Sequence, residues 1–516
     1  MIHNLSKSRY TLYRQCPKAL WMSINKPDDG EKPNPATIEE GKVVGQYAKG
    51  LFGNSVDVTA HTSNDSLDIS KMIENTKKAM IDPKVDTICE AAFSENGCYC
   101  AVDLLHREKG GWAIYEVKSS SHNEQPDKNG KPKKDDISES YIWDIAYQKH
   151  VLTQYGINVT GTYLVRIESS YVRQKELDVK QLFHIKDMSE LIASELKKVA
   201  EYCEAAKALL AKNEEPKAKL HAGCHSPNDC AFKEYCMKLH HVPTPSVFDL
   251  YSIGWNKAIE IYKDTKGKVD YPSLLKSGQI TQARHLRQID AELKHEDKIN
   301  KEAIRKWLKD IITYPVYHLD FETMKSAIPP FPGTHPFQQI PFQYSLHIEQ
   351  EDGTVGHREF LAQANGENPM RELAEKLCAD IPTDVRVLAY NKDFEQGRIE
   401  EMAKAFPDLH DHLMAIHDNI RDLAVPFQKW YYYRPAMNGS FSIKAVLPAL
   451  FPNEPKLDYH NLPGLVHHGG EAMAIFPAML NMTDDEVKVA RKSLLEYCYL
   501  DTWSMVVILR KLYEVS

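Results

Sequence analysis

The sequence has no apolar run that approaches the roughly 20 residues needed to span a lipid bilayer. Its first ten residues, MIHNLSKSRY, also lack the apolar centre of a secretory signal peptide. We therefore predict a cytoplasmic protein without a membrane partner. An excess of positive charge is missing too, because the formal net charge is −8. This charge argues against a protein that coats nucleic acid, but it does not exclude an enzyme with a local basic groove.

A disulfide framework is not expected, because the ten cysteines occur without an export signal. Cys224, Cys230 and Cys236 are evenly spaced, and Cys16 lies far upstream in RYTLYRQCPKALWM. Thiolates with such spacing bind zinc or an iron–sulfur cluster, although cytosolic cysteines are often small buried hydrophobes. The cysteines without a matching pattern are assigned to packing: Cys89, Cys98, Cys100, Cys203, Cys378 and Cys498.

A chain of 516 residues exceeds a single ordinary core and predicts two or three domains. Residues 1–240 mix helices with a β-meander and end in the cysteine cluster. Residues 241–312 are highly charged and predict a helical spacer, and residues 313–516 alternate strands and helices. The fold class is therefore α/β. The polar stretch His122–Asp136 predicts a mobile loop.

An acidic constellation lies in the first of these regions. Strands are predicted over Thr87–Ser94, Cys98–His106 and Trp112–Ser119, and a helix over Glu139–Tyr155. Glu116 and Lys118 are two residues apart and share a strand face, which Asp103 can reach from the neighbouring strand. An Asp and a Glu can hold Mg²⁺, while a lysine can polarise water and stabilise charge on phosphate. The alternative for Glu-x-Lys is a solvated charge pair.

The phrases AVDLLH, YEVKSSS and DIAYQKHVL resemble the motifs of RecB-like PD-(D/E)XK nucleases, which have a restriction-endonuclease-like fold. The resemblance implies Asp103 and Glu116 as ligands of Mg²⁺ or Mn²⁺, Lys118 as the catalytic lysine and Gln148 as an active-site helper. Many relatives carry a histidine on the first helix, here predicted over Thr37–Phe52, and its place is Gly45. Glu40 could replace it as a ligand, although Thr37 to Glu40 also reads as a capping box.

CPKALW and the late cysteine trio resemble the iron–sulfur nucleases of the same branch. The resemblance implies a 4Fe-4S cluster on Cys16, Cys224, Cys230 and Cys236. Those relatives more often space the late cysteines unevenly, whereas both gaps here are five residues. Zn²⁺ therefore stays as the alternative.

A second acidic constellation lies in residues 313–516. Asp320 and Glu322 share one face of a strand predicted over Pro315–Glu322. Glu395 enters a helix after the strand Val385–Tyr390, and a last helix from Thr483 carries Tyr497 and Asp501 one turn apart. Two-metal phosphodiester hydrolysis needs several carboxylates around ions roughly 4 Å apart. For Tyr497 and Asp501 alone, the alternative is an ordinary helix face.

HLDFET, YNKDFE and YCYLDT resemble the three motifs of DEDD exonucleases of the RNase H-like fold, in the subtype with Tyr-x3-Asp. The resemblance implies two Mg²⁺ or Mn²⁺ ions and a tyrosine, Tyr497, that positions water. The implied metal ligands are Asp320, Glu322, Glu395 and Asp501. The family usually has Asp where this chain has Glu395, and Asp422 could supply a carboxylate instead. The aromatic run Trp430–Arg434 invites base stacking, although such runs are more often core.

The chain as a whole resembles an uncharacterised bacterial family in which an iron–sulfur RecB-like nuclease is fused to a DEDD exonuclease. This resemblance implies a metal-dependent nuclease with two active sites that acts on DNA rather than RNA. Its C-terminal site would cut from 3′ to 5′, in DNA repair or anti-phage defence. Two alternatives are an RNase and a nucleic-acid-binding module with one inactive site.

Overall fold

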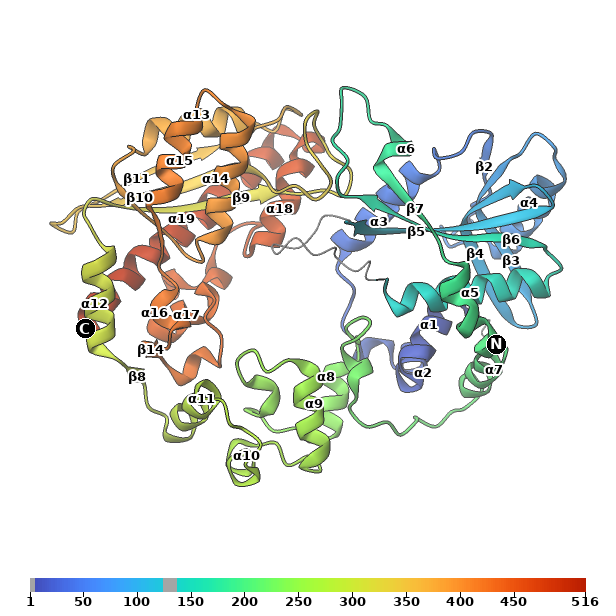
Figure 1. Cartoon of the computed structure of the whole chain (residues 1–516), viewed down its shortest axis with the longest axis horizontal. Helices are drawn as coiled ribbons and strands as arrows, with labels where there is room; N and C mark the ends of the chain where they lie inside the picture. The colour runs from blue at the N-terminus through green and yellow to red at the C-terminus, as the bar shows by residue number, and fades with distance from the viewer. Residues whose placement is uncertain (1–4, 124–136) are drawn as a thin grey trace. The chain divides into compact units, whose positions relative to one another are not determined.

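The computed structural model describes residues 5–123 and 137–516 of the chain. The chain forms two compact units, and both mix helices with a sheet (Figure 1). Unit 1 comprises residues 1–242 and 326–337, and unit 2 comprises residues 243–325 and 338–516. The α/β fold class is therefore confirmed. Most of the predicted mobile loop, residues 124–136, lies outside the described residues, whereas His122 ends a strand.

Unit 1 is built on a seven-stranded sheet with the order β2-β3-β4-β5-β6-β7, in which β1 pairs with β4. Its strands are β1 (Leu5–Ser6), β2 (Ser55–Asp57), β3 (Thr87–Glu95), β4 (Cys98–Glu108), β5 (Gly111–His122), β6 (Val159–Glu168) and β7 (Phe183–Asp187). The strands β3, β4 and β5, which lie close to the three predicted strand ranges, are antiparallel neighbours. β5 and β6 are parallel, and a helix connects them.

The two faces of this sheet carry separate hydrophobic clusters. The helices of the unit are α1 (Lys7–Gln15), α2 (Pro17–Asn25), α3 (Pro35–Ala48), α4 (Ile69–Ile81), α5 (Glu139–Gln154), α6 (Val179–Leu182), α7 (Ser189–Leu210) and α8 (Lys233–Leu239). Tyr10, Tyr147 and Val199 bring α1, α5 and α7 into one cluster. Val44 of α3 packs in the other cluster together with Ile328 of the 326–337 segment.

The predicted capping box at Thr37 is wrong. Helix α3 begins two residues earlier, at Pro35, and its N-cap is Asn34. The Asn34 side chain accepts a hydrogen bond of 2.9 Å from the backbone N–H of Ala36. Proline at the first helical position and asparagine before it together explain the earlier start.

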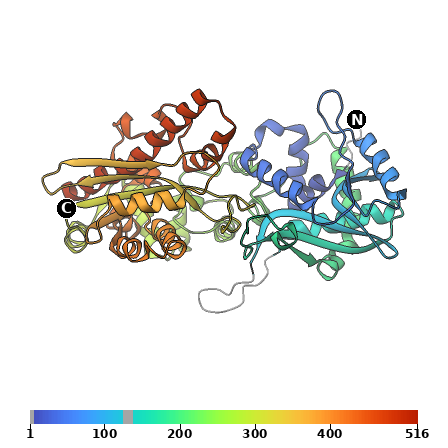
Figure 2. The same cartoon turned by 90° about the horizontal axis from the view of Figure 1, so that it is seen from above.

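Unit 2 contains a five-stranded sheet with the order β11-β10-β9-β12-β13. Its strands are β9 (Val316–Met324), β10 (Ile340–Glu349), β11 (Val355–Leu361), β12 (Arg386–Ala389) and β13 (Ile420–Asp422). Only β10 runs antiparallel to the other four. Helices α13 (Met370–Asp380), α14 (Asp393–Ala405) and α15 (His410–Asn419) cover one face, and α18 (Gly469–Ala478) and α19 (Asp484–Val515) cover the other (Figure 2).

The remaining elements of unit 2 include the segment predicted as a spacer. They are α9 (Trp255–Asp264), α10 (Tyr271–Ser277), α11 (Ala283–Lys294), β8 (Lys298–Ile299), α12 (Lys301–Ile311), α16 (Val425–Gln428), β14 (Tyr432–Tyr433) and α17 (Ile443–Leu450). Four helices within 241–312 agree with the predicted helical character. However, residues 243–325 belong to the same compact unit as 338–516, so they do not form a separate spacer.

The aromatic run in unit 2 is largely core. Trp430, Tyr432 and Tyr433 are buried, and the Tyr433 hydroxyl donates to Glu292 Oε1 at 2.7 Å. This burial supports the packing alternative over base stacking for these three side chains. Among the residues that the structure describes, no helix is both long and apolar enough to cross a bilayer.

Candidate functional site

The acidic residues of unit 2 come together from three elements. Strand β9, at the centre of the sheet, carries Asp320 and Glu322, α14 carries Glu395, and α19 carries Asp501. Carboxylate oxygens of Asp320, Glu322 and Asp501 lie within 4.8 Å of one another. Glu395 is also buried, and its charge acts on Asp320, so it borders the same group. The structure therefore assembles the four predicted ligands.

No ion pair with a lysine, arginine or histidine neutralises any of these four carboxyl groups within the described residues. Burial raises the pKa of Asp320 well above its usual range, and the charges of Asp501, Glu395 and Glu322 raise it further. Burial likewise raises the pKa of Asp501 to about 6. Glu395 Oε2 is buried without a hydrogen-bond partner. Uncompensated hard oxygen donors of this kind fit Mg²⁺ or Mn²⁺.

Two tyrosines and a lysine complete the surroundings of this group. The hydroxyl of Tyr459 donates to Asp501 Oδ1 at 2.6 Å. Lys444 Nζ lies 5.2 Å from the ring centroid of Tyr459 and 5.4 Å from that of Tyr497. The Lys444 charge lowers the pKa of Asp320, Glu322 and Asp501. Lys444 is exposed, which leaves its ammonium accessible to an anionic substrate. Neither Lys444 nor Tyr459 was predicted from the sequence.

Asp422, which the sequence offered as an alternative metal ligand, forms hydrogen bonds with the backbone. Its Oδ1 accepts hydrogen bonds from the backbone N–H groups of Asn391 at 2.9 Å and Ala424 at 2.8 Å. These bonds hold the start of α14 beside the end of β13. Asp422 therefore orients the helix that carries Glu395.

Because no ion pair neutralises Glu395 within the described residues, the stability of the fold is expected to depend on pH. Burial raises the pKa of Glu395 from 4.5 to about 8, and the Asp422 carboxylate contributes to the shift. A raised carboxyl pKa costs the fold stability as pH rises through this window, by about 1.4 kcal/mol per pKa unit. We expect Glu395→Gln to raise the free energy of unfolding by about 2–5 kcal/mol at pH 9 in EDTA, and to change it little at pH 4.

Urea unfolding of both proteins at the two pH values measures this effect. Glu400→Gln, an exposed position on the same helix, is the matched control. Saturating Mn²⁺ should remove the advantage of Glu395→Gln, because the ion stabilises only the protein with the ligand. Equal stabilities of parent and Glu395→Gln at pH 9 would contradict the prediction.

The second cluster lies in unit 1. Asp103 on β4, Glu116 and Lys118 on β5, and Gln148 on α5 meet on one side of the sheet, as predicted. Lys118 Nζ bonds Glu116 Oε1 at 2.5 Å, and Gln148 Nε2 donates to Glu116 Oε2 at 2.7 Å. Asp103 Oδ2 accepts from the backbone N–H of Val117 at 2.7 Å. Asp144, which the helix spacing places beside Gln148, accepts from Lys118 at 2.9 Å.

Lys7 is a member of this cluster that the sequence did not reveal. From the start of α1, its Nζ lies 3.2 Å from Asp103 Oδ1 and 3.1 Å from Glu116 Oε1. Burial alone would lower the pKa of Lys7, but Asp103, Glu116 and Asp144 hold it well above its usual range. Its ammonium thus bridges the two carboxylates that were predicted to bind a metal. Two ammonium groups, those of Lys7 and Lys118, therefore form ion pairs with the carboxylates of unit 1, whereas none does so in the acidic group of unit 2 within the described residues.

This position makes Lys7 a competitor for a divalent ion. We expect Lys7→Met to tighten Mn²⁺ binding at the unit 1 cluster by about tenfold, equivalent to about 1.4 kcal/mol. Calorimetric titration with Mn²⁺ in an Asp320→Ala background measures this affinity without the contribution of unit 2. Lys42→Met, an exposed lysine on α3, is the control. Unchanged or weaker Mn²⁺ binding in Lys7→Met would show that the ammonium does not compete with the ion.

Glu40, the uncertain ligand, has another partner. Its Oε1 accepts from the backbone N–H of Ala327 at 3.1 Å. Within the described residues, no hydrogen bond or ion pair joins Glu40 to Asp103 or Glu116. A different acid, Glu90 on β3, is influenced by Asp103. Burial and the Asp103 charge raise the pKa of Glu90 to about 7. Glu90 has φ of 58°, a conformation that non-glycine residues seldom adopt.

The four predicted cysteine ligands also come together. Cys16 joins α1 to α2, Cys224 ends a short 3₁₀ helix, Cys230 follows it, and Cys236 lies in α8. Burial raises the pKa of the Cys230 thiol to about 11, and its neighbours Cys16, Cys224 and Cys236 add to the shift. No three of these sulfurs, all in described residues, lie within 4.8 Å of one another. Four thiolates are a ligand set suited either to Zn²⁺ or to an iron–sulfur cluster.

The cysteines assigned to packing are consistent with that assignment. All ten cysteines are free thiols. Of the six cysteines assigned to packing, five are buried: Cys89, Cys98, Cys100, Cys203 and Cys498. Cys378 on α13 is partly exposed.

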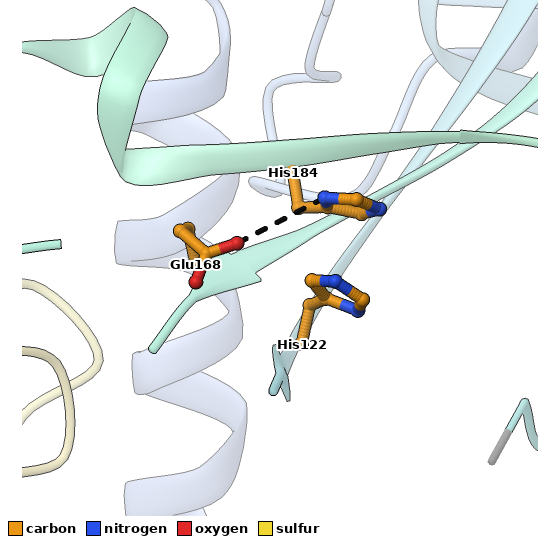
Figure 3. A group of neighbouring side chains, drawn as sticks. All are labelled: His122, Glu168 and His184. Atoms are coloured by element: carbon orange, nitrogen blue, oxygen red, sulfur yellow. Dashed lines mark ion pairs between the residues drawn. The ribbon is translucent and has the colours of Figure 1, made fainter. Parts of the chain in front are cut away.

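Two histidines and a glutamate form a further cluster at the ends of β5, β6 and β7 (Figure 3). Possible ligand atoms of His122, Glu168 and His184 lie within 4.8 Å of one another, a donor set suited to a transition metal. However, the buried Arg166 guanidinium donates to His122 Nδ1 at 3.2 Å, which places the proton of the neutral ring on Nε2. The imidazoles of His122 and His184 stack at 3.5 Å between centroids. We therefore interpret this cluster as a hydrogen-bonded link between strands.

Comparison with known proteins gives two similarities. Residues 317–442 match the family model described as "Domain of unknown function (DUF2779)". That range includes Asp320, Glu322, Glu395 and Asp422, but not Tyr497 or Asp501. The chain is also 26% identical over 207 residues to the uncharacterised protein MG366 of Mycoplasma genitalium. This similarity covers 37% of the present chain and 31% of the relative.

Proposed function

We propose that this protein is a metal-dependent nuclease that hydrolyses DNA at two active sites. The observation that carries the proposal is the group Asp320, Glu322, Glu395 and Asp501. These four carboxylates come from a central strand and two helices, and the described part of the chain supplies no ion pair to any of them. Mutual repulsion of buried carboxylates has a structural cost, which a binding site for divalent ions explains.

The architecture of unit 2 supports a DEDD exonuclease of the RNase H-like fold. The first acidic pair lies on the central strand of a sheet in which one strand, β10, is antiparallel. When bound, two Mg²⁺ or Mn²⁺ ions would activate water and stabilise the leaving oxygen. Tyr497, one turn before Asp501 on α19, would orient the attacking water. Lys444 supplies positive charge for the phosphate.

The unit 1 cluster supports the second site, of the RecB-like PD-(D/E)XK type. Asp103 and Glu116 would hold the ion, and Lys118 would stabilise charge that develops on the phosphate. Gln148 fixes Glu116 through its amide hydrogen bond. The cysteine cluster, which we propose to hold 4Fe-4S rather than Zn²⁺, joins α1, whose first residue is Lys7, to the end of the same unit.

Digestion of matched 5′-labelled DNA and RNA strands tests the proposal. DNA should shorten progressively from its 3′ end with Mg²⁺ or Mn²⁺ and remain intact in EDTA. Degradation of RNA alone would favour the RNase alternative. Binding without degradation of either strand would reduce the protein to a nucleic-acid-binding module.

A further inference from the structure

Unit 2 contains a pocket of about 770 Å³ that is distinct from the acidic group. Its walls come from the 248–252 segment, the residues before α14, helix α16 with the preceding Ala424, and the 438–443 segment, which runs into α17. The volume falls within the range typical of sites for small molecules and cofactors.

Two segments connect this pocket directly to the acidic group. Asn391 lines the pocket, and its backbone N–H donates to Asp422 Oδ1 at 2.9 Å, while the charge of Asp422 acts on the ligand Glu395. Ile443 lines it too, and the next residue is Lys444, whose ammonium lies beside the rings of Tyr459 and Tyr497. A group in the pocket therefore lies beside the two segments that carry Glu395 and Lys444, whose charges both act on Asp320.

The lining of the pocket suits a nucleoside better than a phosphate. No lysine, arginine or histidine lines it within the described residues. Asp249 is its one charged side chain, and Asp249 Oδ2 already accepts from the backbone N–H of Ser246 at 2.7 Å. The half-buried ring of Tyr251 offers apolar surface for a base, and it packs 4.8 Å from the buried ring of Phe441.

Amide side chains add polar recognition to this apolar surface. Asn391, Gln428 and Asn438 all line the pocket. An amide group can both donate to and accept from a base edge, and can likewise contact the hydroxyl of a sugar. This combination of rings and neutral amides is what a nucleoside requires.

The walls are also held in an unusual backbone conformation. Three lining residues other than glycine have positive φ: Ser252 at 52°, Asn391 at 68° and Asn438 at 44°. Such conformations persist where the surrounding structure holds them, and they concentrate at functional sites. At Gly439, a Cβ would lie 2.8 Å from the Asp249 carbonyl oxygen, so only glycine fits there.

Hydrogen bonds fix the 438–443 segment from both sides. The hydroxyl of Tyr390 donates to the Phe441 carbonyl at 2.8 Å, and the Gly439 N–H donates to the Tyr433 hydroxyl at 3.0 Å. The pocket is therefore formed before any ligand arrives, which reduces the ordering cost of binding.

We infer that this pocket binds the sugar and base of a nucleotide next to the phosphate held at the unit 2 carboxylates. The inference rests on the proposed nuclease function and adds a substrate requirement. The strand must be single at this position, because a paired base could not enter the pocket. Lys444, between pocket and carboxylates, then contacts the phosphate that links the two.

A pocket-filling substitution tests the inference. Gln428 lines the pocket and is exposed, so Gln428→Trp should fill the space without disturbing the core. Lys429→Trp, at the next exposed position outside the lining, is the matched control. Both are made in a background that carries Asp103→Asn and Asp320→Asn, which prevents digestion at either proposed site, and melting temperatures confirm that both proteins fold.

The probe is a 5′-fluorescein-labelled oligothymidylate of about 12 nucleotides, a length that covers a single-strand site, and its anisotropy is followed with Mn²⁺. Gln428→Trp should weaken binding by about tenfold, the order expected for one lost stacked base, and Lys429→Trp should not. Equal binding by the two variants, or no binding by their parent, would overturn the inference. If the wild type digests DNA while the two variants bind equally, the nuclease proposal stands and only the pocket assignment falls.

Discussion

Replacing Asp320 with asparagine is expected to slow the 3′-to-5′ shortening of single-stranded DNA by about 10³-fold. An amide at this position weakens the hold on a divalent ion whose charge stabilisation contributes several kcal/mol, and each 1.36 kcal/mol is tenfold in rate. Initial rates on a 5′-labelled strand, measured in an Asp103→Asn background, isolate the unit 2 site. Asp393→Asn, an exposed acid on α14, is the control and should retain full activity.

The same assay with the two substitutions made separately assigns the activities. Asp103→Asn alone should leave the shortening of the strand and remove any cleavage that belongs to unit 1. If neither substitution changes the digestion pattern, the proposed catalytic role of both clusters is wrong. If only one does, the other unit is a binding platform.

Cys230→Ser is expected to cause the largest change in stability, confined to unit 1. Protein purified without air should be brown and contain iron, and the variant should lose both the colour and the iron. Binding of a structural metal contributes on the order of 10 kcal/mol to folding, so the variant's unit 1 should unfold near room temperature while unit 2 stays folded. Limited proteolysis with mass spectrometry identifies the unit that is digested.

Cys378→Ser, in unit 2, is the control and should keep colour, iron and protease resistance. A colourless wild-type protein that contains zinc after purification without air would contradict the iron assignment. Iron in both variants would show that Cys230 is not a ligand.

Much of each acidic group was predictable from strand and helix periodicity. Glu116 and Lys118 alternate on one strand, and Tyr497 and Asp501 lie one turn apart, so local geometry alone places each pair on one face. The neighbouring strand brings Asp103 close because the hairpin turn sets the register. These assignments depend on short-range geometry, which the sequence encodes directly.

The residues that escaped prediction reach their site from distant segments. Lys7 precedes Asp103 by 96 residues, and Tyr459 precedes its partner Asp501 by 42. Neither belongs to a periodic pattern that points to an acidic group. The capping box at Thr37 was predicted wrongly because Asn34 and Pro35 offer a better start to the same helix. Long-range packing, which no local pattern records, decides these positions.

The assignment of residues 326–337 to unit 1 has a consequence for how the protein is made. Ala327 and Ile328 complete a hydrophobic cluster with Val44, and Arg173 donates to the carbonyl of Pro329. During synthesis, residues 1–242 therefore leave the ribosome with part of their core still missing. Strand β9, with Asp320 and Glu322, is translated before that missing part arrives. Unit 1 thus reaches its final packing only after the acidic strand of unit 2 has been made.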